Sequence, residues 1–175
     1  MQNLPDDEIY KYSNLPLHSC DIGDFFPILK HINIQNKDAT ILMQQGRSAQ
    51  NEGNLEQAFD YYSQSINVLL QITGPMNPEV ASCIAKMANI QYKFGDYLQA
   101  IELQTKSIII QEKLLGFDSP TVAYSYSNLG LYYHTCRYFS KGFEYMHKSL
   151  KILEVVCGQN HPDISSIYLN LGMMY

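Results

Sequence analysis

Five series of residues recur at a spacing of 42 in this 175-residue sequence. Three keep one residue type: Gly74, Gly116 and Gly158; Pro78, Pro120 and Pro162; and Ser65, Ser107 and Ser149. Two keep only small residues: Gly46, Ala88, Gly130 and Gly172; and Ala58, Ala100 and Gly142. A fixed period of this length is typical of a solenoid, in which one supersecondary unit stacks on the next.

Each unit has the start and stop signals of two helices. Its Pro follows Asn77, Ser119 or His161. Asn and Ser are favoured N-caps, and Pro fits the first helical turn because its missing N–H would be unpaired there. The Gly of each unit is a residue type that commonly ends a helix. The pattern predicts first helices over 38–51, 78–93, 120–135 and from 162 onward, and second helices over 54–72, 96–115 and 138–157.

The stretch "GDYLQA", residues 95–100, repeats in weaker form as "GNLEQA" from residue 53 and "RYFSKG" from residue 137. A small residue, a turn, an aromatic and a second small residue are typical of tetratricopeptide repeats, although their usual period is 34. The sequence therefore predicts an all-α, right-handed superhelix of about three and a half 42-residue helix pairs. The predicted repeats are 38–77, 78–119, 120–161 and a partial 162–175, and residues 1–37 are an N-terminal extension that caps the first.

Composition and charge argue against several classes of function. The net charge of −5 argues against binding nucleic acid through bulk positive charge. The four cysteines, Cys20, Cys83, Cys136 and Cys157, have no zinc-ligand spacing and indicate a reduced, cytoplasmic chain. No apolar run is long enough to span a membrane, and no catalytic motif is present. We expect a non-catalytic protein without metal or cofactor, and without membrane insertion.

The motif "NLG" at Asn128–Gly130 and again at Asn170–Gly172 resembles kinesin light chain-type repeats. The run "DIGDFFPILKHIN" from Asp21 and the run "LEVVCGQNHPDISSIYLNLG" resemble the clustered-mitochondria (Clu) family. This resemblance implies the repeat region of a large cytosolic protein. Members bind messenger RNAs for mitochondrial proteins and control mitochondrial distribution and biogenesis.

Two other functions stay open on the sequence. One is a kinesin-light-chain-like cargo adaptor that binds linear peptides. The other is a homo-oligomer formed through the last helix, which the sequence predicts to have no second helix beside it before Tyr175. We expect the chain to be a piece of a longer protein.

Stacked first helices are expected to line a concave groove for a protein or peptide partner. The predicted groove residues are Arg47, Lys86, Asn89, Tyr92, Lys93, Tyr124, Asn128, Leu131, His134 and Asn170. Asn side chains carry donors and an acceptor, so they can pair with a peptide backbone of any sequence. The alternative is that Asn128 and Asn170 bind neighbouring backbone or face water.

Asn89 and Asn128 also match two Asn of the carboxylate clamp with which related repeats hold chaperone tails. The basic partners of that clamp are replaced in this chain by Ala85, Ser166 and Asn170. Capture of a chaperone tail is therefore not expected.

A candidate RNA contact lies on the second helix of the third repeat, at Lys141, Lys148 and Lys151. Such a stripe can meet phosphates, and Tyr132 or Tyr133 could stack on bases. Because most short lysine stripes are solvated faces and the chain is acidic, a solvated face is favoured, and core packing is expected for the tyrosines.

Overall fold

The computed structural model describes residues 37–159 and 161–175, and within these ranges all regular structure is helical. The helices are α1 (Lys37–Asn51), α2 (Leu55–Ile72), α3 (Pro78–Phe94), α4 (Tyr97–Leu115), α5 (Pro120–Thr135), α6 (Phe139–Cys157) and α7 (Pro162–Met174). Each begins within one residue of the position that the repeat predicts, and α1 to α6 also end within one residue of it. The N-terminal extension predicted over 1–37 lies outside the described residues, apart from Lys37.

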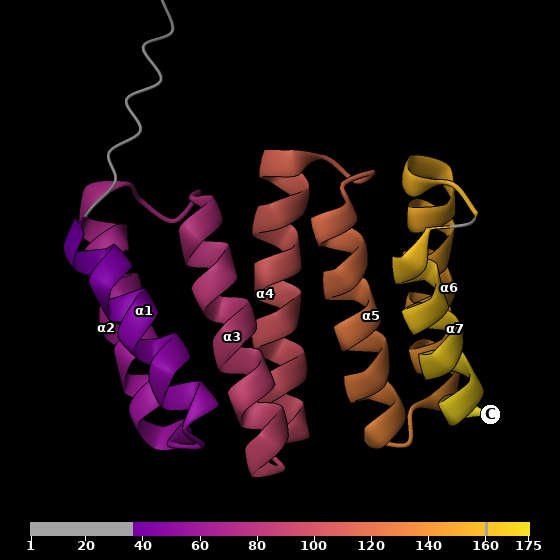
Figure 1. Ribbon diagram of the computed structural model, residues 1–175, viewed down its shortest axis with the longest axis horizontal. Coiled ribbons are helices and arrows are strands. Elements are labelled where there is room, and N and C mark those ends of the chain that lie inside the picture. Colours follow the sequence, from indigo (N-terminus) through magenta and orange to yellow (C-terminus); the bar gives the residue numbers. More distant parts are fainter. Residues whose placement is uncertain (1–36, 160) are drawn as a thin grey trace, which may run out of the picture. The chain divides into compact units, whose positions relative to one another are not determined.

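Helices α1 to α6 form three successive antiparallel pairs, and α7 follows the third (Figure 1). Each helix packs against its neighbours in the chain, and α7 also contacts α5. This arrangement confirms the predicted all-α superhelix of helix pairs.

Two of the three expected N-caps are formed by side chains. Asn77 Oδ1 accepts a hydrogen bond from the Glu79 N–H at 2.6 Å, and His161 Nδ1 accepts one from the Asp163 N–H at 3.3 Å. Ser119 has the extended backbone of a cap, but its side chain makes no capping hydrogen bond. Pro occupies the first turn of α3, α5 and α7, so the helix starts are set by local chemistry.

The turn inside each pair contains one left-handed residue. Gly53 has φ +85° and Gly95 has φ +87°, but the equivalent residue of the third pair is Arg137, with φ +64°. A side chain makes this backbone conformation unfavourable, whereas glycine adopts it freely. The third pair therefore carries local strain that the first two avoid.

The small residues mark where paired helices approach closely. A Cβ atom placed on Gly130 would lie 2.9 Å from the Gly142 carbonyl oxygen, and one on Gly142 would lie 3.0 Å from the Gly130 carbonyl oxygen. The equivalent residues of the second pair, Ala88 and Ala100, are fully buried. The predicted wedge of small residues is thus present, and at the third pair it leaves no room for even a methyl group.

The recurring serines link the second helix of a pair to the first. Ser65 Oγ donates to the Ala39 carbonyl at 3.1 Å, and Ser107 Oγ donates to the Ala81 carbonyl at 2.7 Å. Ser149 is equally buried, yet its hydroxyl has no hydrogen-bond partner among the residues that the structure describes. The serine hydrogen bond to the first helix therefore forms in two of the pairs. In the third pair, Ser127 Oγ of α5 donates to Met146 Sδ of α6 instead, at 3.4 Å.

Candidate functional site

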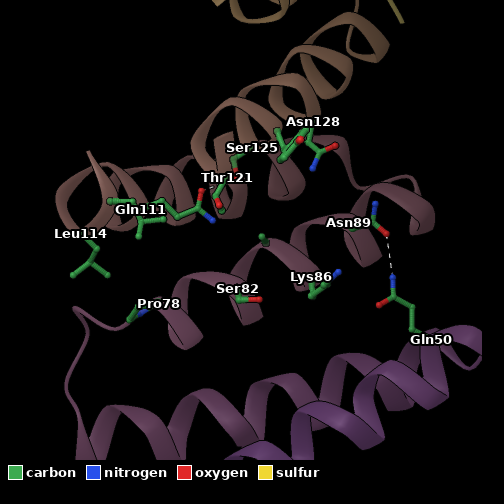
Figure 2. Close-up of a pocket in the computed structure, with 13 residues that line it drawn as sticks. Gln50, Pro78, Ser82, Lys86, Asn89, Gln111, Leu114, Thr121, Ser125 and Asn128 are labelled. Atoms are coloured by element: carbon green, nitrogen blue, oxygen red, sulfur yellow. Dashed lines mark hydrogen bonds between the residues drawn. The ribbon is translucent and has the colours of Figure 1, made fainter. Parts of the chain in front are cut away.

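A cleft of about 500 Å³ opens between α3 and α5. It is lined by α3 on one side and α5 on the other, with the ends of α1 and α4 closing it (Figure 2). The lining residues are Gln50, Pro78, Ser82, Ala85, Lys86, Asn89, Gln111, Leu114, Leu115, Thr121, Tyr124, Ser125 and Asn128.

Helices α3 and α5 contact each other near their C-terminal ends. There the Tyr92 ring stacks on the Tyr132 ring, with centroids 4.7 Å apart. The Tyr92 hydroxyl is also hydrogen-bonded to Thr135 Oγ1 at 3.1 Å. These contacts lie past the last cleft residue of either helix, so the earlier turns of the two helices are left to line an opening.

Helices α5 and α7 are instead connected at both ends. The Tyr124 hydroxyl donates to the Asp163 carboxylate near the helix starts. His134 Nε2 is hydrogen-bonded to the Met174 carbonyl, 3.1 Å away, near the helix ends. These two links hold α7 directly against α5.

One end of the cleft is polar and carries side chains with free hydrogen-bonding capacity. Gln50 Nε2 donates to Asn89 Oδ1 at 3.2 Å, which fixes the Asn89 amide (Figure 2). Lys86 and Asn128 are exposed, and neither makes a side-chain hydrogen bond or ion pair with any other residue in the described part of the chain. Their donors and the Asn128 acceptor are therefore available to a ligand.

The floor of the cleft is polar but satisfied internally. Ser125 Oγ donates to Gln111 Oε1 at 2.7 Å, and Gln111 Nε2 donates to Ser107 Oγ at 3.2 Å. All three side chains are buried. Because buried groups that bind one another are rigid, this network shapes the cleft and leaves ligand contacts to its walls.

The other end of the cleft is apolar. Pro78 begins α3 there, and the last two residues of α4, Leu114 and Leu115, lie beside it. These two residues remain 39% and 47% exposed, so they offer apolar surface to an incoming group.

Four of the predicted groove residues line the cleft together: Lys86, Asn89, Tyr124 and Asn128. The others lie elsewhere. Tyr92 and His134 make the interhelical contacts described above, and Leu131 packs against two apolar clusters. Exposed Arg47 and Lys93, and half-buried Asn170, lie outside the cleft lining.

Nine lining residues were not predicted. Five lie on α3 and α5 themselves, and the other four are Gln50 and three residues at the end of α4, namely Gln111, Leu114 and Leu115. Gln50 had a signal, because it lies 42 positions before Tyr92 and in register with it. The α4 residues had none, because a groove built from first helices alone leaves no place for the end of a second helix.

The lysines of the candidate RNA contact are partly engaged within the protein. Lys148 Nζ lies 3.9 Å from the Glu112 carboxylate and 3.9 Å from the centroid of the Tyr126 ring. Lys141 Nζ lies 5.5 Å from the centroid of the Tyr133 ring, and Lys151 is exposed. Contact of this stripe with RNA stays a prediction.

The tyrosines near this stripe pack inside the protein. Tyr132 is buried and Tyr133 stacks on Tyr145 with ring centroids 5.4 Å apart, which confirms core packing. Burial raises the pKa of Tyr132 to about 12, although the neighbouring Asn89 side chain lowers it.

Cysteine and metal chemistry are not indicated at the cleft. Burial raises the pKa of the Cys83 thiol to about 11, so it stays protonated and unreactive at neutral pH. Over residues 37–159 and 161–175, no group of three or more His, Cys, Asp or Glu could hold a metal ion. In the same ranges no helix is both long and apolar enough to cross a bilayer.

Two family models described as "Tetratricopeptide repeat" match residues 37–108 and 122–163. Together with the stacked helix pairs, these matches place the chain in the tetratricopeptide-repeat family.

Among curated proteins, the chain is similar to the clustered mitochondria protein of Arabidopsis thaliana. The two are 36% identical over 88 residues, which are 50% of this chain and 6% of that protein. The Homo sapiens clustered mitochondria protein homolog is 29% identical over 77 residues, 44% of this chain and 6% of that protein. These matches confirm the resemblance to the Clu family, although the chain spans only a small part of those proteins.

Solved structures share the fold. BtubC from P. vanneervenii gives a TM-score of 0.73 at 22% identity, covering 78% of this chain and 55% of that one. The TPR-like repeats of a kinesin light chain candidate from Podosopora anserina give 0.69 at 18% identity, covering 78% and 64%. The first TPR domain of Spaghetti (RPAP3), bound to the HSP90 peptide SRMEEVD, gives 0.55 at 14% identity, covering 81% and 98%.

Proposed function

We propose that this chain is a non-catalytic interaction scaffold whose α3–α5 cleft binds an extended segment of a partner protein. The observation that carries the proposal is the polar end of the cleft, where Lys86 and Asn128 have no partner among the described residues. Lys86 lies on α3 and Asn128 on the facing helix α5 (Figure 2). The hydrogen-bonded side chains of Gln111 and Ser125 form a rigid floor to the same cleft.

An amide suits a peptide partner because it can donate to one backbone carbonyl and accept from one backbone N–H. The cleft volume falls within the range of ordinary ligand sites, which are roughly 300–1,000 Å³. Spaghetti (RPAP3), whose structure contains a bound peptide, shares this fold, which supports a peptide as the type of ligand.

The proposal extends to the parent protein through the similarity to clustered mitochondria proteins. We infer a cytosolic, mRNA-binding protein that controls mitochondrial distribution and biogenesis, in which this region recruits protein partners. A kinesin-light-chain-like cargo adaptor is the alternative. Coiled-coil heptads upstream in the parent sequence would favour the adaptor, and Clu-type upstream domains would exclude it.

The test begins with a peptide selected from a random library by binding to the whole chain. Replacing Asn128 with Ala is expected to weaken its binding about tenfold, because one or two hydrogen bonds of about 1 kcal/mol each are lost. Fluorescence anisotropy measures the affinity. Asn67→Ala, on the exposed face of α2, is the matched control and is expected to have no effect.

Hydrogen exchange then locates the bound peptide. Protection is expected in the turns of α3 and α5 that line the cleft. Binding that is indifferent to Asn128→Ala, with protection elsewhere, would overturn the proposed site.

A further inference from the structure

The cleft has two chemically different ends, and this difference defines the peptide that would fit it. Its walls carry Lys86, Asn89 and Asn128 at one end and Pro78 and Leu114 at the other (Figure 2). Leu115, the next residue of α4, also lines the cleft. We propose, building on the function above, that the cleft selects an extended peptide with one carboxylate side chain and one bulky apolar side chain.

The preference for a carboxylate side chain follows from the charge of the cleft. Among the described residues that line the cleft, Lys86 alone is charged, and it forms no ion pair with another of them. A carboxylate placed beside it would gain a charge-assisted hydrogen bond, and the Asn128 amide can bind the same group or the adjacent backbone. A basic peptide side chain would meet repulsion there.

The preference for a bulky apolar side chain follows from the exposed apolar surface at the other end. Leu114 and Leu115 end α4 with much of their surface uncovered, and they line the same cleft as Pro78. An aromatic or large aliphatic side chain that covers them removes apolar surface from water on both molecules. Between the two ends, the Ser125 and Gln111 side chains are hydrogen-bonded to each other, so they do not require a second charged side chain in the peptide.

The helix geometry sets the spacing. Pro78 and Lys86 are eight positions apart on α3, which corresponds to roughly 12 Å along the axis. An extended chain rises about 3.3 Å per residue and points alternate side chains to the same side. The apolar and acidic residues should therefore be about four positions apart in the peptide.

The probe is a short Ser/Gly peptide with one Phe and one Asp about four positions apart, prepared in both chain orders. Its affinity for the whole chain is compared with peptides in which Asp becomes Asn, Phe becomes Ala, or the two residues become adjacent. We expect one order to bind best and each change to weaken it about five- to tenfold, the size of one charge-assisted hydrogen bond or one buried side chain.

Protein variants connect each peptide residue to one end of the cleft. Lys86→Ala should weaken the Asp peptide about tenfold and leave the Asn peptide unchanged. Lys86→Glu should reverse the preference, so that a Lys peptide binds better than the Asp peptide. Lys93→Ala, which removes an exposed lysine outside the cleft on the same helix, should change nothing.

An equivalent pair of variants tests the apolar end. Leu115→Ala should weaken the Phe peptide and leave the Ala peptide unchanged, whereas Leu98→Ala, at the exposed start of α4, should affect neither. Circular dichroism confirms that each variant folds.

The outcomes separate this inference from the function on which it rests. Equal binding of the Asp and Asn peptides, or no binding of any Phe/Asp peptide, would overturn the ligand class. If a library-selected peptide still depends on Asn128, the site stands with a different ligand. If that peptide is also indifferent to Asn128→Ala, the proposed function fails as well.

Discussion

The second and third helix pairs, α3/α4 and α5/α6, pack through the same repeat positions but with different small residues. Two buried methyl groups, those of Ala88 and Ala100, lie between the helices of the second pair. In the third pair the equivalent residues, Gly130 and Gly142, bring backbone against backbone. One repeat register therefore accepts either alanines or glycines where the paired helices meet.

The pairs also differ in the hydrogen bonds between their helices and in the turns that join them. Ser107 joins the helices of the second pair through a hydrogen bond to the Ala81 carbonyl, whereas the Ser149 hydroxyl is buried without a partner among the described residues. The third pair also has Arg137 in a left-handed turn where the second has Gly95. The third pair also has its own buried hydrogen bond, from Ser127 Oγ to Met146 Sδ. A shared repeat register therefore determines which positions face each other, but not how they are bonded.

The strongest test of this difference introduces the second pair's residues into the third. The double change Gly130→Ala and Gly142→Ala should lower the free energy of unfolding by about 2–3 kcal/mol. Each new Cβ would lie near 3 Å from a backbone carbonyl oxygen, which cannot move alone, and overpacking of this kind outweighs the helix propensity of Ala. Urea denaturation measures the loss, and hydrogen exchange should locate it in α5 and α6.

Two single changes are the controls. Gly172→Ala, where a Cβ meets nothing within 4 Å among the described residues, should stabilise α7 by up to about 1 kcal/mol. Ala88→Gly should destabilise the second pair by at least that amount. A third pair that accepts both alanines without loss would show that its close approach is not required.

The next test concerns the serines. Ser107→Ala should cost about 1–2 kcal/mol, because it removes the bond to Ala81 and one partner of the Gln111 amide. Ser149→Ala should be neutral within about 0.5 kcal/mol, or slightly stabilising, since its hydroxyl makes no hydrogen bond that could be lost. Thermal unfolding of the two variants gives the contrast, and equal losses would mean that Ser149 is paired in solution.

The smallest expected effect is at the turns. Arg137→Gly should stabilise the protein by about 0.5–1 kcal/mol, because relief of a left-handed side chain exceeds the added freedom of glycine in the unfolded chain. Gly95→Ala should destabilise by a similar amount for the same reason. Chemical denaturation compares the two, and opposite signs are the expected result.

The cleft was predictable only in part. Lys86, Asn89, Tyr124 and Asn128 follow from the repeat register, because residues on one face of a helix can be counted from the small residue. The six remaining predicted groove residues are not in the cleft, and two of them, Tyr92 and His134, pair with neighbouring helices instead. A count along one helix cannot reveal which side chains the next helix will engage.

The sequence by itself determined the helices, their ends and their pairing, because Pro, Gly and the small residues act over a few neighbouring positions and recur every 42 residues. Only the tertiary structure decided that α3 and α5 line a cleft while Tyr124 and His134 link α5 to α7, and that Ser107 is bonded while Ser149 has no partner among the described residues. These outcomes depend on the distances between packed helices. Such distances result from all the side chains packed between two helices, and no single motif encodes them.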